Sequence, residues 1–280
     1  MAGGTGTRLY PLTISLNKHF LPIYDKPMIF YSLSTLLIAG VKEILIVTNP
    51  NDMESFQNLL KDGSQLGISI SYTSQDKANG IADVFNYCED FVNKQKFFLI
   101  LGDNIFFGSY LSKYFQEAIK LNDPALIFSY HISNPKDYGV IEYGDKNKSK
   151  IIKIHEKPKN FISNDVVTGL YIYDSSVFSI FKDIEPSKRG EYEITDINNI
   201  YAKNYLLKNI KLGRGITWID AGTFQNLLSI SSIVSNIQNR QGRLVCSPEE
   251  IAYRQGYIKK MKVNKNLNEY YKLLNEIYDE

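Results

Sequence analysis

Short, continuous apolar runs that stop at turn residues constrain the fold of this chain most strongly. Three of them span residues 44–48, 97–101 and 125–130, and the first two end at Asn49-Pro50 and at Gly102-Asp103. Runs of this length, rich in Ile, Val and Phe, are typical of strands that are buried on both faces. The sequence therefore predicts a sheet with a covering layer on each side.

Helical patterns lie between these runs. Four apolar residues share one face of a predicted helix that ends before Gly40: Ile29, Leu33, Leu36 and Leu37. A similar pattern follows Gly80. Strands that alternate with helices predict an α/β fold, here a Rossmann-like, mostly parallel mixed sheet flanked by helices.

The second half of the chain contains a different strand pattern. Residues 139–143 and 150–154 flank the polar turn 144–147, which predicts a hairpin. Residues 167–173 form a further apolar run. We therefore expect antiparallel strands in addition to the parallel ones.

Helices are expected at the C-terminal end. One spans 223–242, with Leu227, Leu228 and Val234 facing inward, and Ser247 followed by Pro248 is a strong signal for the start of another. The tail carries an apolar stripe at helical spacing: Leu267, Tyr270, Tyr271 and Leu274. We expect a core domain over residues 1–242 and a helical extension over 243–280.

Composition excludes several classes of protein. The 280 residues include 32 Lys and Arg against 30 Asp and Glu, and this net charge of +2 argues against a dedicated nucleic-acid-binding protein. Cys88 and Cys246 alone cannot form a disulfide framework. No apolar run reaches the roughly 18 residues that a membrane span needs, and the first residues lack the pattern of a signal peptide. We expect a cytoplasmic protein that does not bind membranes.

The start of the chain is rich in glycine. Gly3, Gly4 and Gly6 leave the backbone free to approach a ligand and to direct N–H groups at phosphate oxygens. The segment is not a Walker A loop, and it fails the dinucleotide fingerprint because Leu9 occupies the third glycine position. Arg8 and Lys18 would supply cations to a triphosphate. From these residues alone, a flexible tail with surface cations is an equally good interpretation.

An ordered set of motifs extends this pattern along nearly the whole chain. The motifs occupy residues 3–11, 18, 22–28, 102–104, 138–140, 156–158, 167–171, 189–191, 193–196, 218–223 and 246–254. Together they resemble the signature of the sugar-1-phosphate nucleotidylyltransferases, and within that family most of all the glucose-1-phosphate thymidylyltransferases. The resemblance implies a sheet of the nucleotide-diphospho-sugar transferase type.

The resemblance implies a reaction and its surroundings. The enzyme would transfer dTMP from dTTP to glucose 1-phosphate by in-line attack on the α-phosphorus, giving dTDP-glucose, a glycan or lipopolysaccharide precursor, and pyrophosphate. It would use Mg²⁺ as its cofactor. A homotetramer and a second, regulatory nucleotide site are also implied.

The resemblance assigns charged residues to the reacting phosphates. Arg8 and Lys18 resemble the cations that bind the triphosphate, and Lys157 resembles the lysine that holds the phosphate of the sugar 1-phosphate. Asp103 and Asp220 resemble the ligands of the Mg²⁺ ion. Each aspartate follows apolar residues, and strands can bring two such positions together at one sheet edge. From the residues alone, each could cap a helix or form a turn, and for Asp220 this is the favoured interpretation.

The resemblance also implies the neutral contacts. Gln75 and Gly80 would recognise the base, because a glutamine amide can pair with thymine and glycine admits the base close to the backbone. The nucleotide-binding set comprises Gly3, Gly4, Thr5, Gly6, Thr7, Arg8, Gln75, Gly80 and Asp103. The sugar-phosphate-binding set comprises Tyr138, Gly139, Glu156, Lys157, Val167 and Trp218, although a sole tryptophan also suits a core position. Arg189 and Glu191 would support the site.

The chain departs from the family pattern in several places. Family members carry an apolar strand before the glycine loop, and we expect this strand to be missing here, through a late start codon or a true truncation. His19 replaces the usual glutamine, the interior of the 75–83 segment differs, and Ala221 replaces a common threonine.

These departures leave two alternatives open. One is a uridylyl- or cytidylyltransferase that acts on a related sugar 1-phosphate. The other is a catalytically weak subunit that binds nucleotide sugars or regulates a partner. A nicotinamide-dependent oxidoreductase is disfavoured by the failed dinucleotide fingerprint.

Overall fold

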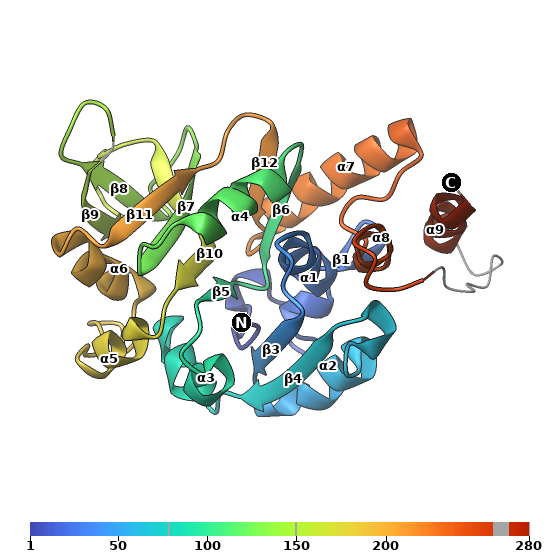
Figure 1. Ribbon diagram of the computed structural model, residues 1–280, viewed down its shortest axis with the longest axis horizontal. Helices are drawn as coiled ribbons and strands as arrows, with labels where there is room; N and C mark the ends of the chain where they lie inside the picture. Colours follow the sequence, from blue (N-terminus) through green and yellow to red (C-terminus); the bar gives the residue numbers. More distant parts are fainter. Residues whose placement is uncertain (78, 149, 260–268, 280) are drawn as a thin grey trace. The chain divides into compact units, whose positions relative to one another are not determined.

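The computed structural model describes residues 1–77, 79–148, 150–259 and 269–279, which form two compact units (Figure 1). The loop unit contains Ala2–Ser74, Gly102–Gly108 and the chain from Ile219 onward. The sheet unit contains Met1, Gln75–Leu101 and Ser109–Trp218. Each unit has its own strands, helices and buried side chains.

The sheet unit is built on a mixed sheet. Its strands are β5 (Phe97–Ile100), β7 (Ala125–His131), β8 (Gly139–Tyr143), β9 (Ile151–Glu156), β10 (Asp165–Tyr173) and β11 (Leu207–Lys211). The order across the sheet is β11-β7-β10-β8-β9, and β5 also pairs with β10. β11 is parallel to β7, whereas β10 is antiparallel to β5, β7 and β8. The predicted α/β fold with a mixed sheet and flanking helices is confirmed. The sheet of this unit is mostly antiparallel, however, and not mostly parallel as predicted, because β10 and the β8–β9 hairpin run against their neighbours.

Aromatic side chains explain why the strand runs of this sheet are apolar on both faces. Phe97 lies 6.4 Å from Phe85 of α3 and 5.9 Å from Phe178 of α5, measured between ring centroids. The next residue, Phe98, points to the opposite face, where it lies 5.9 Å from Phe115 of α4. The helices are α3 (Phe85–Val92), α4 (Leu111–Lys120), α5 (Ser176–Lys182) and α6 (Ile194–Lys203), with the 3-10 turn η5 (Ala82–Val84) before α3. Strands covered on both faces are therefore confirmed.

The predicted hairpin is formed by β8 and β9, which pair antiparallel with Gly139 opposite Glu156. The outer edge of β9 is held by Asn199 of α6. Its side chain accepts from the Ile154 amide at 2.7 Å and donates to the Ile154 carbonyl at 2.9 Å. These bonds satisfy backbone groups that an edge strand otherwise leaves free.

The loop unit starts with the glycine-rich segment and contains a parallel strand pair. Its elements are η1 (Thr7–Leu9), η2 (Lys18–Phe20), β1 (Pro22–Ile23), β2 (Lys26–Pro27), α1 (Ile29–Ile38), β3 (Glu43–Thr48), η3 (Pro50–Asp52), α2 (Met53–Leu60), η4 (Ser64–Leu66), β4 (Ser69–Ser74), β6 (Asn104–Gly108), α7 (Phe224–Gln241), α8 (Pro248–Arg254) and α9 (Glu269–Asp279). β3 and β4 pair in parallel, joined by α2. The strand β12 (Ile216–Asp220) runs from the sheet unit into this one. The amide of Ala2 donates to the Val47 carbonyl of β3 at 2.7 Å, which fixes the start of the glycine-rich segment.

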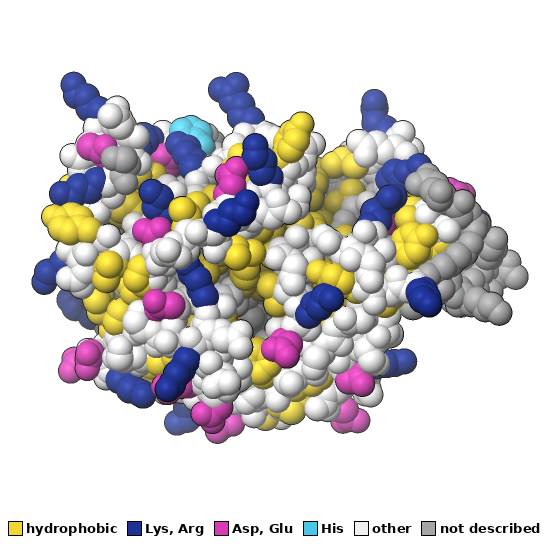
Figure 2. Space-filling model, viewed as in Figure 1, with side chains coloured by type: hydrophobic (Ala, Val, Ile, Leu, Met, Phe, Trp, Pro, Cys, Tyr) yellow, Lys and Arg dark blue, Asp and Glu magenta, His cyan; other side chains and the backbone are white. Residues whose placement is uncertain are grey.

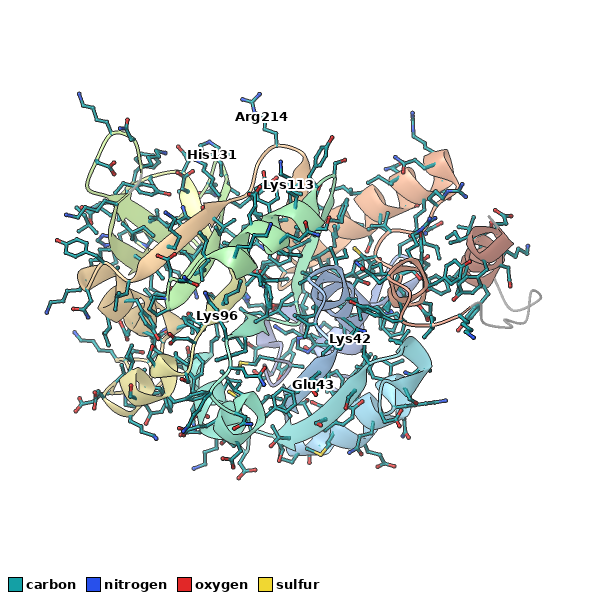
Figure 3. All side chains as sticks on the ribbon, in the orientation of Figure 1. Lys42, Glu43, Lys96, Lys113, His131 and Arg214 are labelled. Atoms are coloured by element: carbon teal, nitrogen blue, oxygen red, sulfur yellow. The ribbon has the colours of Figure 1, made fainter. Side chains whose placement is uncertain are left out.

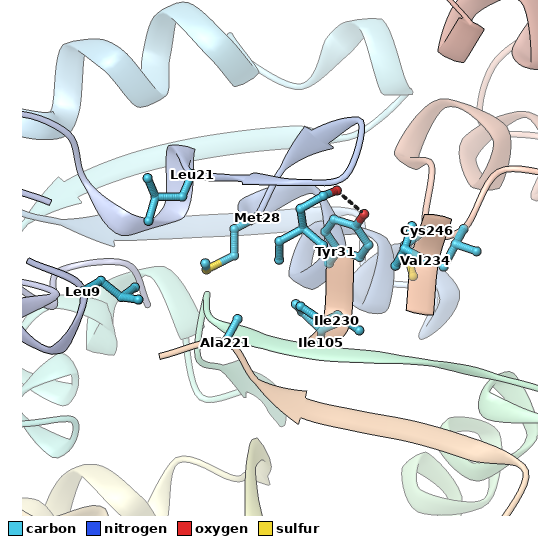
Figure 4. Close-up of a cluster of buried hydrophobic side chains, with 11 residues drawn as sticks. Leu9, Leu21, Met28, Tyr31, Ile105, Ala221, Ile230, Val234 and Cys246 are labelled. Atoms are coloured by element: carbon cyan, nitrogen blue, oxygen red, sulfur yellow. Dashed lines mark hydrogen bonds between the residues drawn. The ribbon is translucent and has the colours of Figure 1, made fainter. Parts of the chain in front are cut away.

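One apolar cluster forms the centre of the loop unit (Figure 4). It brings together Leu9 after the glycine-rich segment, Met28 and Tyr31 at the start of α1, Ile105 of β6 and Ile230 of α7. The Tyr31 hydroxyl donates to the Ile23 carbonyl at 2.8 Å, so this buried polar atom is satisfied. The cluster anchors the ends of the segments that carry the candidate site.

The helix predicted over residues 223–242 is α7, with the Thr223 side chain capping its N-terminus and Gly242 at its C-cap. Val234 is buried as expected, but the prediction for Leu228 was wrong, since this side chain is 64% exposed. Buried Ile230 and Val234 are four residues apart and define the inward stripe. Leu227 lies at the edge of this stripe, and Leu228 is turned about 100° further round the helix.

The C-terminal helices also follow the sequence pattern. α8 begins at Pro248, and the Ser247 side chain accepts from the Glu250 amide at 3.2 Å. Tyr270 and Leu274 of α9 are buried in a cluster that includes Leu244 and Tyr253. This stripe is therefore used for packing within the chain. Leu267, predicted as part of it, lies outside the described residues.

No helix within the described residues is long and apolar enough to span a membrane. On the face seen in Figure 2, lysine and arginine side chains are spread out and mixed with acidic ones. This distribution fits the nearly balanced charge of the sequence.

A buried carboxylate joins several strands of the sheet unit. Asp165, at the start of β10, lies 2.9 Å from the ammonium groups of Lys148 and Lys211. It also lies 3.2 Å from Nδ1 of His131, the last residue of β7, which Figure 3 labels. Burial alone would raise the pKa of Asp165, but the bonds from Lys148 and Lys211 outweigh it and lower this pKa to about 2.

We expect Asp165→Asn to lower the free energy of unfolding at pH 7 by about 1–3 kcal/mol, because two charged hydrogen bonds are lost. The folded pKa of about 2 lies below the ordinary value of 3.8, so the contribution of Asp165 is complete above pH 3.8 and is lost as the pH falls towards 2. Urea unfolding from pH 7 to pH 3 should show the difference between wild type and variant shrinking. Exposed Asp183→Asn is the matched control, and a difference that does not change with pH would contradict the assignment.

Candidate active site

The glycine-rich segment and Lys18 lie side by side in the loop unit. A Cβ atom built on Gly4 would lie 3.5 Å from the Lys18 ammonium. Gly6 has a φ of +64° and caps η1, and its carbonyl accepts from the Thr13 hydroxyl at 2.8 Å. Gly3 is buried, whereas Thr5, Thr7 and Arg8 are exposed. The segment therefore presents an open backbone next to a lysine, as a phosphate-binding loop requires.

Lys18 contacts one of the two candidate metal ligands. Its ammonium lies 2.5 Å from Oδ2 of Asp103, which follows β5 and is 8% exposed. The Asp103 carbonyl accepts from the Ala221 amide at 2.9 Å, and this backbone bond draws in the neighbouring residue Asp220. Two carboxylates distant in the sequence are thus brought together.

The two carboxylates influence each other electrostatically. Burial alone would raise the pKa of Asp103, but the Lys18 ammonium more than offsets it, so this pKa lies well below its usual range. Burial raises the pKa of Asp220, and the negative charge of Asp103 raises it further. Arg8 and Lys18 lower the pKa of Asp220, but they do not outweigh burial and the charge of Asp103, so the charged form of this carboxyl is disfavoured. A divalent cation would relieve that repulsion.

Arg8 places a second cation beside the carboxylates, next to Asp220. Its guanidinium lies 4.0 Å from Oδ2 of Asp220, and the Gly222 amide donates to Oδ1 of the same carboxylate at 2.7 Å. A Cβ atom on Gly222 would lie 2.6 Å from the Arg8 guanidinium, so a larger residue here would displace the Arg8 side chain. Within the described residues, no group of three or more His, Cys, Asp or Glu side chains could hold a metal ion. The two carboxylates instead suit an ion that keeps water and phosphate ligands, as Mg²⁺ does.

The sheet unit brings the predicted sugar-phosphate residues together through the β8–β9 hairpin. Gly139 faces Glu156, and the Lys157 amide donates to the Tyr138 carbonyl at 3.0 Å. The Lys157 ammonium lies 3.9 Å from Glu156, and its side chain is half exposed. Four of the six predicted residues therefore line one end of this hairpin.

Trp218 and Val167 lie near the same hairpin. The ring of Trp218 packs edge-on against Tyr138, with 5.4 Å between centroids, and it is 6% exposed. Val167 follows Val166, which pairs with Val140 of β8, and β10 has a register shift after Val167. Trp218 is thus a packed residue that also supports Tyr138.

The two predicted base-binding residues, Gln75 and Gly80, both have close contacts within the sheet unit. Gln75 is buried, and its Nε2 donates to Asp83 at 2.8 Å, while Oε1 has no hydrogen-bond partner among the described residues. Gly80 has a φ of +105°, and a Cβ atom there would lie 2.5 Å from the Tyr192 carbonyl. The close approach of the Tyr192 backbone is therefore a second reason for glycine at this position.

Several supporting residues were not singled out from the sequence. Asp83 orients the Gln75 amide, and the Thr195 hydroxyl donates to Glu156 at 2.7 Å. Both lie inside segments that the sequence analysis marked, but only the fold shows what they contact. Arg189, expected to play a supporting role, binds Glu193 at 2.8 Å.

The comparison with protein families agrees with this arrangement of residues. A family model described as nucleotidyl transferase matches residues 1–236. The chain therefore belongs to the nucleotidyl transferase family, and it is an enzyme of that class.

Comparisons with individual proteins show which members of this family the chain is similar to. Glucose-1-phosphate thymidylyltransferase of Neisseria meningitidis is 42% identical over 263 residues, covering 94% of this chain and 91% of the relative. A crystal structure from Bacillus anthracis, described as a glucose-1-phosphate thymidylyltransferase in complex with sucrose, is 40% identical with a TM-score of 0.76. The match covers 83% of this chain and 92% of the Bacillus anthracis chain.

A more distant structure is UDP-glucose pyrophosphorylase complexed with UDP-glucose. It is 25% identical with a TM-score of 0.74, covering 84% of this chain and 96% of that one. The resemblance stated from the motifs is confirmed.

We expect Asp103→Asn to reduce pyrophosphate release on the order of 100-fold or more, because the change removes a charged group beside the reacting phosphates. Nucleotide binding should change far less, since the glycine-rich segment and both cations remain. Steady-state turnover and calorimetric binding of the nucleoside triphosphate measure the two effects. Exposed Asp62→Asn is the control, and near-normal turnover of Asp103→Asn would show that Asp103 holds no metal.

Proposed function

We propose that this enzyme transfers dTMP from dTTP to glucose 1-phosphate, forming dTDP-glucose and pyrophosphate. An oxygen of the sugar phosphate attacks the α-phosphorus of dTTP, and the bond from that phosphorus to the β-phosphate oxygen breaks. The nucleophile is already an anion, so the reaction needs no general base. The main task of the protein is to hold two polyanions together.

The observation that carries this proposal is the group of charges around the glycine-rich segment. Lys18 lies beside Gly4 and Asp103, and Arg8 lies beside Asp220, all within the loop unit. We assign the triphosphate to this group. Backbone N–H groups of residues 3–7 would bind its oxygens, and Lys18 and Arg8 would offset the charge on the departing pyrophosphate.

We propose Mg²⁺ as the metal, since enzymes of this class generally use a divalent ion. Asp103 and Asp220 would hold it, because their mutual repulsion favours an added positive charge. When bound, such an ion offsets negative charge on phosphate oxygens. Lys18, which contacts Asp103, would keep that carboxylate oriented.

We assign the other substrate groups to the sheet unit. Lys157 would bind the sugar phosphate as a compact point charge, and Glu156 with Tyr138 would contact the glucosyl group. The free Oε1 of Gln75 would accept a hydrogen bond from the base, while Asp83 prevents the amide from turning over. Thymine carries the N–H donor and carbonyl acceptor that a glutamine amide matches.

The relatives favour thymidine over the alternatives. The thymidylyltransferase structure is 40% identical to this chain, against 25% for the UDP-glucose pyrophosphorylase. The charged residues of the candidate site are all present, and Lys18 contacts Asp103, which disfavours a binding subunit without catalysis. We also propose a homotetramer, for which exposed Phe224 and Leu228 on α7 offer an apolar surface. A cytoplasmic location remains our expectation from the sequence.

Pyrophosphate release with Mg²⁺, measured for five nucleoside triphosphates against several sugar 1-phosphates, tests the proposal. We expect the highest kcat/KM for dTTP with glucose 1-phosphate. Preference for UTP or CTP would overturn the assignment of the base while keeping the reaction. If no pair released pyrophosphate and dTTP still raised the melting temperature, the chain would be a binding subunit.

A further inference from the structure

The side chain of Asn17 uses all of its hydrogen-bonding capacity next to the phosphate-binding lysine. Its Nδ2 donates to the Ala2 carbonyl at 3.3 Å and to Asp52 at 2.6 Å. Its Oδ1 accepts from the His19 amide at 3.0 Å and from the His19 ring at 2.7 Å. Two donors and two acceptors are the full complement of an asparagine amide.

These four bonds join three separate segments of the loop unit. Ala2 begins the glycine-rich segment, His19 lies in η2 and Asp52 ends η3. The amide of Ala2 is already fixed by Val47 of β3, so its carbonyl bond to Asn17 holds this residue from the other side. Asn17 therefore sets the distance between the glycine-rich segment and η2.

Lys18 lies between two of these fixed points. It follows Asn17 directly and precedes His19, whose ring is buried. The Lys18 side chain extends past Gly4 to Asp103. A rotation of η2 would therefore move the ammonium away from both the glycine-rich segment and the carboxylate.

His19 contributes a ring whose direction is set by Asn17. Because Oδ1 of Asn17 can only accept, Nδ1 of the ring must carry the proton. The other nitrogen, Nε2, is buried and has no hydrogen-bond partner among the described residues. The bond to Asn17 is thus the ring's one polar contact there, and removing it would leave a buried polar ring unsatisfied.

We infer that Asn17 is a positioning residue for Lys18. It acts with Asp52 to hold the lysine against the triphosphate site. The inference rests on the proposed function, in which Lys18 binds the triphosphate of dTTP. It predicts that Asn17 affects the use of dTTP and not the use of the sugar phosphate.

We expect Asn17→Ala to lower kcat/KM for dTTP roughly 10- to 100-fold, because small misplacements of a positioning contact have effects of this size. The KM for glucose 1-phosphate should stay unchanged. Asn236→Ala is the matched control, since Asn236 is an exposed asparagine of the loop unit whose side chain donates to the Ser232 carbonyl within α7. Steady-state kinetics with each substrate varied in turn measures the split.

Exchanging the residue types at positions 17 and 52 distinguishes a positioning role of Asn17 from a general effect on stability. Asn17→Asp places two carboxylates at the 2.6 Å contact with Asp52 and should impair dTTP use at least as much as the alanine variant. The double variant Asn17→Asp with Asp52→Asn keeps the acceptors for His19 and restores a hydrogen bond between residues 17 and 52, but it still lacks the bond to the Ala2 carbonyl. We expect it to recover part of the kcat/KM for dTTP that Asn17→Asp loses. This comparison does not depend on whether Asn17→Ala folds.

Three results would overturn the inference. In the first, Asn17→Ala keeps wild-type kinetics with dTTP. In the second, the loss falls equally on both substrates. In the third, the double variant is no better than Asn17→Asp. If wild-type enzyme itself does not turn over dTTP, the proposed function fails instead, so the two failures are distinguishable.

Discussion

The contact between Lys18 and Asp103 is the interaction on which the rest of the loop unit depends. Asp103 is almost completely buried, and a buried carboxylate without a partner is strongly destabilising. The lysine that satisfies it comes from a short turn after the glycine-rich segment, far away in the sequence. The same pair holds the Lys18 ammonium beside Gly4 of the glycine-rich segment.

The two units carry different kinds of chemistry. The loop unit supplies fixed charges and backbone N–H groups, which suit phosphates and a divalent ion. Apart from Lys157, the sheet unit supplies neutral or hydrogen-bonded groups, such as Gln75 held by Asp83 and Glu156 held by Thr195. These groups suit a base and a sugar, which are recognised by shape and by hydrogen bonds. The division follows from the folding of each unit around its own core.

The sequence predicted the elements well because their signals are local. The apolar runs became β3, β5 and β7, and the Ser247-Pro248 start signal became the first turn of α8. Leu228 was misplaced because helical spacing fixes which residues share a face but not how wide that face is. The ion pairs around Asp165 lie beyond local signals, since Lys148 and Lys211 meet it only across strands.

The residues of the candidate site were predicted from the sequence more completely than the neighbouring residues that hold them in place. Motif order identified Lys18, Asp103 and Asp220, and the fold brings them together. Asn17 and Asp83 were visible in the sequence, yet nothing in their spacing indicates which side chains they contact. The hydrogen-bond partners of these side chains depend on contacts between single atoms in the folded chain. Periodicity and composition do not predict such contacts.

The claim that Asp103 and Asp220 hold a divalent ion against the triphosphate is tested most directly by calorimetric binding of dTTP. Binding is measured with Mg²⁺ and with EDTA, in wild type and in Asp220→Asn. The account expects Mg²⁺ to tighten dTTP binding about tenfold or more in wild type, and the variant to lose most of that gain. An equal gain from Mg²⁺ in both proteins would contradict it.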